Sequence, residues 1–153
     1  MSIKTGSRGY RGHFDRMVST CALVVSVVAT VLAVYTAYSE SQQKKIENLV
    51  ALYAYLHDPA LSRARGAVRD PAFDASYFSD DVHRVCSSFD LAGNLVRNGA
   101  VDEFIFLDYW HATLLVLDKR LGPMWDREMA DGQTVRMLYK DFYWLVQEAK
   151  KRR

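Results

Sequence analysis

The chain contains one long apolar stretch, and shorter segments with a helical period of apolar residues follow it. The stretch runs from Met17 to Tyr38 and contains no charged residue, no proline and no glycine. At a rise of about 1.5 Å per residue, a helix of this length spans the roughly 30 Å hydrocarbon core of a bilayer. The pattern therefore predicts one transmembrane helix.

Three other interpretations of this stretch are weaker. A cleaved signal peptide has a shorter apolar region of about 7 to 15 residues, although Ala37-Tyr38-Ser39 resembles a cleavage site. A buried core helix is disfavoured because apolar residues surround the whole circumference over more than the usual length. An interfacial helix needs a charged face, which this stretch lacks.

The pattern predicts an all-α fold, in which one N-terminal transmembrane helix continues into a small bundle of four to five helices. The expected segments are a basic flexible leader (1–16), the transmembrane helix (17–38), a juxtamembrane amphipathic helix (39–58) and the helical bundle domain (59–153). No glycine or proline interrupts residues 39–57, so the membrane helix is expected to continue as one long helix until Pro59 stops it.

Helix-start and helix-stop residues divide the domain into further helices. The expected bounds are Leu61 to Val68, Ser79 to Gly99, Asp102 to Leu121, and about Thr134 onward to a basic C-terminal run. Apolar residues cover most of the circumference of the helix after Asp102. That helix is therefore expected at the centre of the bundle.

Charge gives two opposing indications of membrane orientation. Basic residues are more frequent before the stretch (Lys4, Arg8, Arg11 and Arg16) than directly after it (Lys44 and Lys45). The positive-inside rule then places the amino terminus in the cytoplasm and the domain outside. However, no disulfide pair or glycosylation sequon marks the domain as external, because Cys21 lies in the stretch and Cys86 stands alone. The orientation in the cell membrane stays open.

Small residues share one face of the apolar stretch. They are Ala22, Ser26, Ala29, Ala33 and Ala37. Such spacing permits close packing of two membrane helices. It predicts contact with another membrane protein or self-association through the span, in addition to the lipid bilayer as a partner.

Two pairs of acidic and imidazole side chains are the candidates for chemistry. Asp80 and His83, and likewise Asp108 and His111, lie one helical turn apart, a spacing also found at metal sites in helical bundles. These pairs are better explained as polar faces, because bundle metal sites need several more carboxylates. No nucleophile elbow, phosphate-binding loop or HExxH motif is present. We therefore expect no catalytic residue, metal or cofactor.

Two further groups are candidates for partner contact. The tail aromatics Tyr139, Tyr143 and Trp144 cover more circumference than one buried face requires, which suggests a partner surface. Arg63, Arg65 and Arg69 could contact lipid headgroups close to the membrane. The domain is nearly neutral, so no nucleic acid partner is expected.

Several short strings resemble a known family. They are Leu56-His57-Asp58-Pro59 with Arg63 and Arg65, Phe89-Asp90 with Gly93, Leu95-Val96, Gly99 and Val101-Asp102, and finally Trp110, Leu121 and Pro123. Together they resemble a bacterial family of single-span helical proteins, the domain of unknown function 4760. The resemblance implies a membrane-tethered helical domain without an established active site, and it implies that the domain is cytoplasmic.

The sequence as a whole favours a single-pass membrane protein that acts as an adaptor or regulatory subunit by binding a partner. The alternative is a membrane-bound, metal-assisted hydrolase that uses Asp108, His111 and His83.

Overall fold

The computed structural model describes residues 8–75, 77–129 and 131–152. Over these residues the chain forms six α-helices, one short 3-10 helix and no strand. The prediction of an all-α protein, with a long apolar N-terminal helix followed by a helical bundle, is confirmed.

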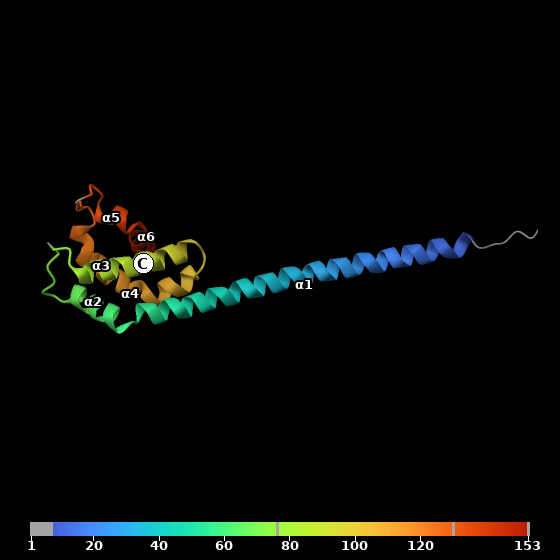
Figure 1. Ribbon diagram of the computed structural model, residues 1–153, viewed down its shortest axis with the longest axis horizontal. Coiled ribbons are helices and arrows are strands. Elements are labelled where there is room, and N and C mark those ends of the chain that lie inside the picture. The colour runs from blue at the N-terminus through green and yellow to red at the C-terminus, as the bar shows by residue number, and fades with distance from the viewer. Residues whose placement is uncertain (1–7, 76, 130, 153) are drawn as a thin grey trace, which may run out of the picture. The chain divides into compact units, whose positions relative to one another are not determined.

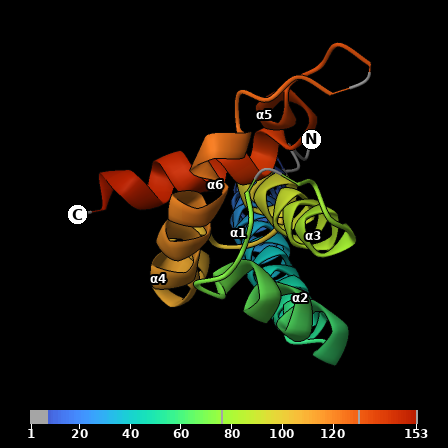
Figure 2. The same cartoon turned by 90° about the vertical axis from the view of Figure 1, so that its left-hand side faces the viewer.

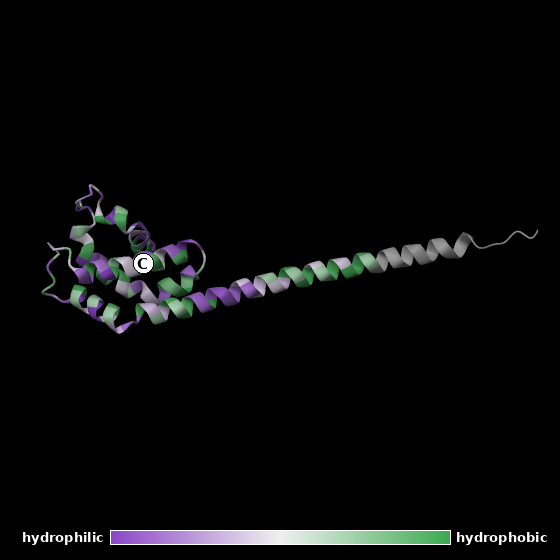
Figure 3. Ribbon diagram, viewed as in Figure 1, coloured by the Kyte–Doolittle hydropathy of each residue, from purple (hydrophilic) through white to green (hydrophobic). Residues whose placement is uncertain are grey.

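Helix α1 (Arg8–Leu56) is continuous through the apolar stretch and the amphipathic segment after it (Figure 1). Figure 3 shows the change from apolar to polar residues along this helix. Residues 8–16, which were expected to belong to a flexible leader, are helical, because extending an existing helix costs far less than starting one. Residues 1–7 of the leader lie outside the described part.

Three bundle helices begin at side-chain caps. Helices α2 (Pro59–Arg69), α3 (Asp80–Arg97) and α4 (Glu103–Leu121) follow Asp58, Ser79 and Asp102 respectively. Each cap oxygen accepts a hydrogen bond from a backbone N–H of the first turn, a group that has no partner within the helix. The two caps expected from the sequence, Ser79 and Asp102, therefore start the helices as proposed.

Helix α3 ends near Gly99, as expected from the sequence. Gly99 has φ +70°, a left-handed conformation that costs glycine little. The N–H of Gly99 donates to the carbonyl of Val96, and the N–H of Ala100 donates to the carbonyl of Leu95. This pair of bonds is a Schellman motif, which turns the chain directly toward α4.

The last helical region differs from the single helix expected from about Thr134. A 3-10 helix (η1, Gly122–Met124) follows α4, and then come two helices, α5 (Val135–Leu138) and α6 (Lys140–Lys151). Tyr139 separates them with φ −113° and ψ 52°. Its side chain is buried and bonded to α3, so tertiary contacts hold this residue outside helical geometry.

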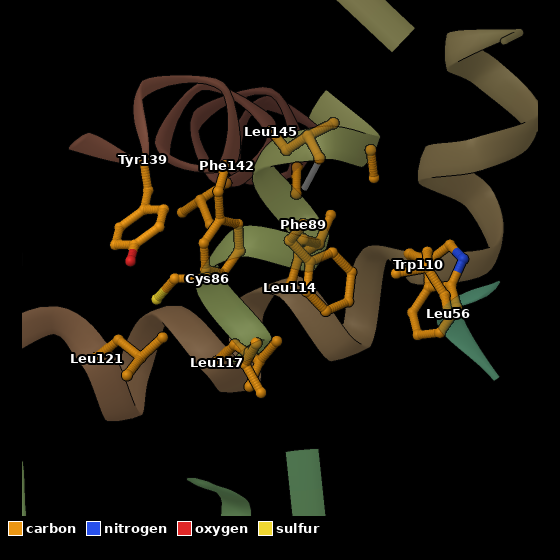
Figure 4. Packing of buried hydrophobic residues seen from close by; sticks show 14 of the residues in the cluster. Leu56, Cys86, Phe89, Trp110, Leu114, Leu117, Leu121, Tyr139, Phe142 and Leu145 are labelled. Carbon is orange, nitrogen blue, oxygen red and sulfur yellow. The ribbon is translucent and has the colours of Figure 1, made fainter. Parts of the chain in front are cut away.

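The core lies between α3, α4 and α6, and Figure 2 shows α6 lying across the other two. The rings of Phe89 and Phe142 stack at 5.3 Å, and Trp110 packs edge-on against Phe89 at 5.4 Å between centroids. Leu114, Leu117, Leu121 and Leu145 complete this cluster in Figure 4. Buried apolar side chains from three helices thus fix the bundle.

Helix α4 is less enclosed than the sequence suggested. Phe106, Leu107 and Trp110 are buried. Exposed apolar residues occupy its other side: Phe104, Ile105, Tyr109 and Val116. A helix that is apolar all round was expected at the bundle centre, but in this fold one side of α4 is only partly covered, with the Tyr109 ring 4.9 Å from the Tyr53 ring of α1.

The last turns of α1 belong to the bundle. Leu52 and Leu56 are buried in the core. Asn48 donates a hydrogen bond to the carbonyl of Ala100 at 3.0 Å, and the His57 ring bonds to the hydroxyl of Tyr109 at 3.1 Å. Residues 43–153 accordingly form one compact unit.

Candidate partner-binding groove

The apolar part of α1 is exposed throughout. Every side chain from 22 to 44 is exposed, and the large apolar ones from Leu23 to Tyr38 are 52–70% exposed. The small residues Ala22, Ser26, Ala29, Ala33 and Ala37 belong to this stretch, and no described element covers them. By length and composition, this is the one helix among the described residues that is able to cross a membrane.

A groove runs between α1 and α3 in the bundle. One hollow of about 210 Å³ and a second of about 420 Å³ meet at Tyr55, which lines both. The lining of the first is Asn48, Ala51, Leu52, Tyr55, Leu91 and Leu95. The lining of the second is Ala54, Tyr55, Asp58, Ala60, Leu61, His83, Arg84 and Ser87. We call the two together the α1–α3 groove.

The lining follows the period of the two helices. On α3 the residues recur at Arg84, Ser87, Leu91 and Leu95, which is one face of a helix. The opposite wall comes from α1 and, in the second hollow, also from Asp58, Ala60 and Leu61 at the start of α2. Since α3 residue 95 shares a hollow with α1 residue 48 and α3 residue 84 shares one with α1 residue 54, the two helices run antiparallel along the groove.

The groove has an apolar floor and apolar rims. Leu52 and Leu61 are 4% and 8% exposed and form its floor. Tyr55 and Leu91, on opposite walls, are 44% and 46% exposed. Large apolar residues on both sides of a hollow are typical of a site that another molecule covers.

Three polar side chains lie at the α2 end of the groove. Asp58 already has hydrogen-bond partners, since its carboxylate accepts hydrogen bonds from the N–H groups of Ala60 and Leu61. His83 also has a partner, because its Nδ1 forms a hydrogen bond with the Tyr139 hydroxyl at 2.5 Å. Arg84 is exposed and forms no hydrogen bond or ion pair within the described residues.

A separate cavity of about 640 Å³ lies where α4 meets the end of α6. Its lining is Phe104, Leu107, Asp108, His111 and Arg152. His111 donates from Nε2 to the carbonyl of Ala149 at 3.1 Å, and Arg152 donates to the carbonyl of Phe104 at 3.3 Å. These two side chains therefore connect the end of α6 to α4.

The fold brings together only two of the three residues that the hydrolase hypothesis uses. Asp108 and His111 line the same cavity, whereas His83 lines the α1–α3 groove. Among the described residues, no group of three or more His, Cys, Asp and Glu side chains is placed to hold a metal ion. The arrangement thus offers no observation that favours this alternative.

One member of the expected aromatic partner surface, Tyr139, requires a correction. Tyr139 is 4% exposed and belongs to the core. Tyr143 and Trp144 are half-buried: the Tyr143 ring meets the Trp125 ring at 5.6 Å, and Trp144 lies beneath the Arg97 guanidinium at 6.0 Å. Core packing of a small domain explains most of these contacts.

Of the expected basic surface, Arg65 requires a correction, whereas Arg63 and Arg69 are exposed. Arg65 is buried, where it donates to the carbonyl of Leu56 at the end of α1 and lies 5.2 Å from the Trp110 ring. Burial, followed by the charge of Arg69, lowers the pKa of Arg65. Arg65 thus connects α1, α2 and α4.

The sequence interpretation missed the residues that line the groove. The buried face of α3 leaves Leu91 and Leu95 outside. Two leucines four residues apart beyond the core face were the available signal. Tyr55 likewise lies beside the buried positions Leu52 and Leu56 of α1.

These features define a class of protein: a small helical bundle, with an open groove, that directly follows an exposed apolar helix. The chain belongs to the family of the domain of unknown function DUF4760, whose family model matches residues 23–149. The resemblance noted in the sequence is thereby confirmed. No curated protein and no solved structure matches the chain.

Proposed function

We propose that this chain is a single-pass membrane protein whose helical domain binds a partner protein, as an adaptor or regulatory subunit. The observation that carries the binding role is the α1–α3 groove, with Tyr55 and Leu91 exposed on its two walls. The apolar stretch of α1 supports the anchoring role.

The energetic argument for anchoring is simple. Ten large apolar side chains between residues 23 and 38 are more than half exposed. Moving these side chains out of water is worth on the order of 10 kcal/mol. Soluble proteins rarely expose a continuous apolar surface of this size. Backbone groups in this stretch are paired within the helix, as a bilayer interior requires.

Membrane extraction of the full chain tests the anchor. We expect the expressed protein to stay in the membrane fraction through alkaline carbonate washing, with an intact mass that includes residues 1–38. A water-soluble product that begins near Glu40 would contradict the proposal, because it would identify the stretch as a cleaved signal peptide.

Site-specific photocrosslinking in native membranes tests the binding role. A photoreactive residue at Leu91 or Tyr55 is expected to give a discrete adduct with another protein. Val116 on α4 is the matched control, because it is 43% exposed, close to the 46% of Leu91, and lies outside the groove. Adducts with lipid only, or equal adducts from Leu91 and Val116, would count against a groove-binding partner.

A further inference from the structure

The shape and chemistry of the α1–α3 groove also indicate what kind of element binds there. From Arg84 to Leu95, the α3 wall extends about 16 Å, or about three turns of helix. The α1 wall from Asn48 to Tyr55 is shorter, about 10 Å, and Asp58 and the start of α2 extend it. An occupant of about twelve helical residues would fill this length.

The groove suits a helix better than an extended peptide. Both walls are α-helices, and their backbone N–H and C=O groups are paired within those helices. An extended peptide would therefore find few partners for its own backbone groups here, and the cost of leaving them unpaired is high. A helix satisfies its own backbone and needs only apolar contacts from Tyr55, Leu91 and Leu95.

One cation without a partner among the described residues is available for recognition at the α2 end, beside the Asp58 carboxylate that lines the same hollow. Arg84 is the one charged side chain of the groove lining that has no bond within the described residues, since Asp58 caps α2. A carboxylate on the occupant would pair with this guanidinium. A cationic occupant would instead meet an unpaired arginine of the same sign.

We infer that the α1–α3 groove binds an amphipathic helix of a partner protein, with an apolar face on Leu91 and Tyr55 and a carboxylate beside Arg84. This inference rests on the proposed binding function and specifies the chemistry of the partner. The apolar floor supplies contact area, and Arg84 supplies the preference for acidic partners.

A pair of designed peptides tests the inference on the full chain, held in phosphatidylcholine nanodiscs. Both probes are stapled helices of about twelve residues with leucines at positions 3, 7 and 10. One probe carries Glu at its first position and the other carries Lys. We expect the Glu probe to bind about fivefold tighter than the Lys probe, which is the effect of one exposed ion pair.

Two variants complete this test. Arg84→Glu should reverse the preference between the two probes, whereas Arg63→Glu, an exposed arginine on α2 outside the groove, should leave it unchanged. Leu91→Asp should abolish saturable binding of both probes. Since Leu91 is 46% exposed, the thermal unfolding of this variant should match that of the natural chain.

Several outcomes would overturn the inference: no saturable binding, equal binding of the two probes, or an unchanged preference in Arg84→Glu. Crosslinks from Leu91 that join two copies of this chain would also overturn it, because a second copy would then be the occupant. Partner adducts at Leu91 in native membranes, together with failure of the probes, would reject this inference and leave the proposed function standing.

Discussion

At the scale of single residues, one string that marks the family, Phe89-Asp90 with Gly93, lies at the junction between α3 and α6. Gly93 lies against the backbone of Asp141, so close that a methyl group at this position would collide with the Asp141 carbonyl. Asp141 itself is buried and paired with Arg97 at 3.0 Å. A motif that was found by resemblance therefore has a packing reason.

Gly93→Ala is expected to destabilise the domain by about 2 kcal/mol or more, because the obstacle is a backbone atom that cannot rotate away. Thermal or urea unfolding of the purified chain measures this. Gly66→Ala on α2 is the control: nothing lies within 4 Å of the added methyl group, and alanine favours a helix, so this variant should be stabilised by about 0.5 kcal/mol. Equal effects of the two substitutions would refute the packing argument.

We expect the Tyr139 hydroxyl to make the stability of the bundle sensitive to alkaline pH. Burial first, and then the charges of Cys86 and Asp90, raise the pKa of Tyr139 above its ordinary value. A raised pKa in the folded state gives stability that is full below about pH 10 and is lost as the pH rises through the folded-state pKa. We expect melting temperatures to fall across this alkaline range.

Tyr139→Phe should make that fall shallower. The variant should also be less stable at neutral pH, since it lacks the hydrogen bond to His83. Tyr77→Phe is the control, because Tyr77 is 69% exposed and should follow the natural chain. Parallel curves for Tyr139→Phe and the natural chain would show that ionisation of Tyr139 does not drive the alkaline loss.

At the scale of secondary structure, α6 begins without a capping side chain of its own. Asp90 of α3 provides the cap, because its Oδ1 accepts hydrogen bonds from the N–H groups of Asp141 at 2.9 Å and Phe142 at 3.2 Å. This cap comes from a residue about fifty positions earlier in the chain. The start of α6 therefore depends on tertiary packing, unlike the starts of α2, α3 and α4.

Asp90→Ala is expected to cost about 1 to 2 kcal/mol of domain stability, because two N–H groups lose their acceptor. Hydrogen exchange should show faster exchange in the first turn of α6 specifically. Asp126→Ala removes an exposed ion pair with Arg136 and should change stability by less than about 0.5 kcal/mol. Uniformly faster exchange over the whole bundle would contradict a local capping role.

At the scale of the whole molecule, the proposed anchor and the bundle share α1. Helix α1 contributes the exposed apolar stretch, the core residues Leu52 and Leu56, and one wall of the α1–α3 groove. A partner bound in the groove would thus contact the same helix that carries the proposed anchor. Such an arrangement suits an adaptor, whose task is to hold a partner at the membrane.

Charges in the middle of the apolar stretch should release the protein from membranes. Replacement of Val28 and Val31 by arginine adds a cost of about 2.5 to 3.5 kcal/mol per charge at the centre of a membrane helix. We expect the double variant to appear in the carbonate-soluble fraction. Ile46→Arg, at an exposed position beyond the stretch, should stay with the membrane. Retention of the double variant would argue against a lipid-embedded helix.

The orientation of the protein in the membrane can be tested by labelling a single cysteine of the bundle. Cys86 is unsuitable as a reporter because it is buried and burial raises the pKa of its thiol. A cysteine at the exposed position Lys140 is a better reporter. Labelling of intact cells with an impermeant thiol reagent at this position would place the domain outside, and labelling only after lysis would place it in the cytoplasm.

The sequence by itself determined the features that depend on neighbouring residues. Ser79, Asp102 and Gly99 predicted helix boundaries, since a cap needs only a partner within one turn. The uncharged stretch predicted the long apolar helix for the same local reason. Only the tertiary structure decided the burial of Tyr139 and Arg65, the break before α6 and the α1–α3 groove. Each of these depends on contacts with other elements, many of them distant in the chain, and a periodic pattern along one helix does not reveal which helix faces it.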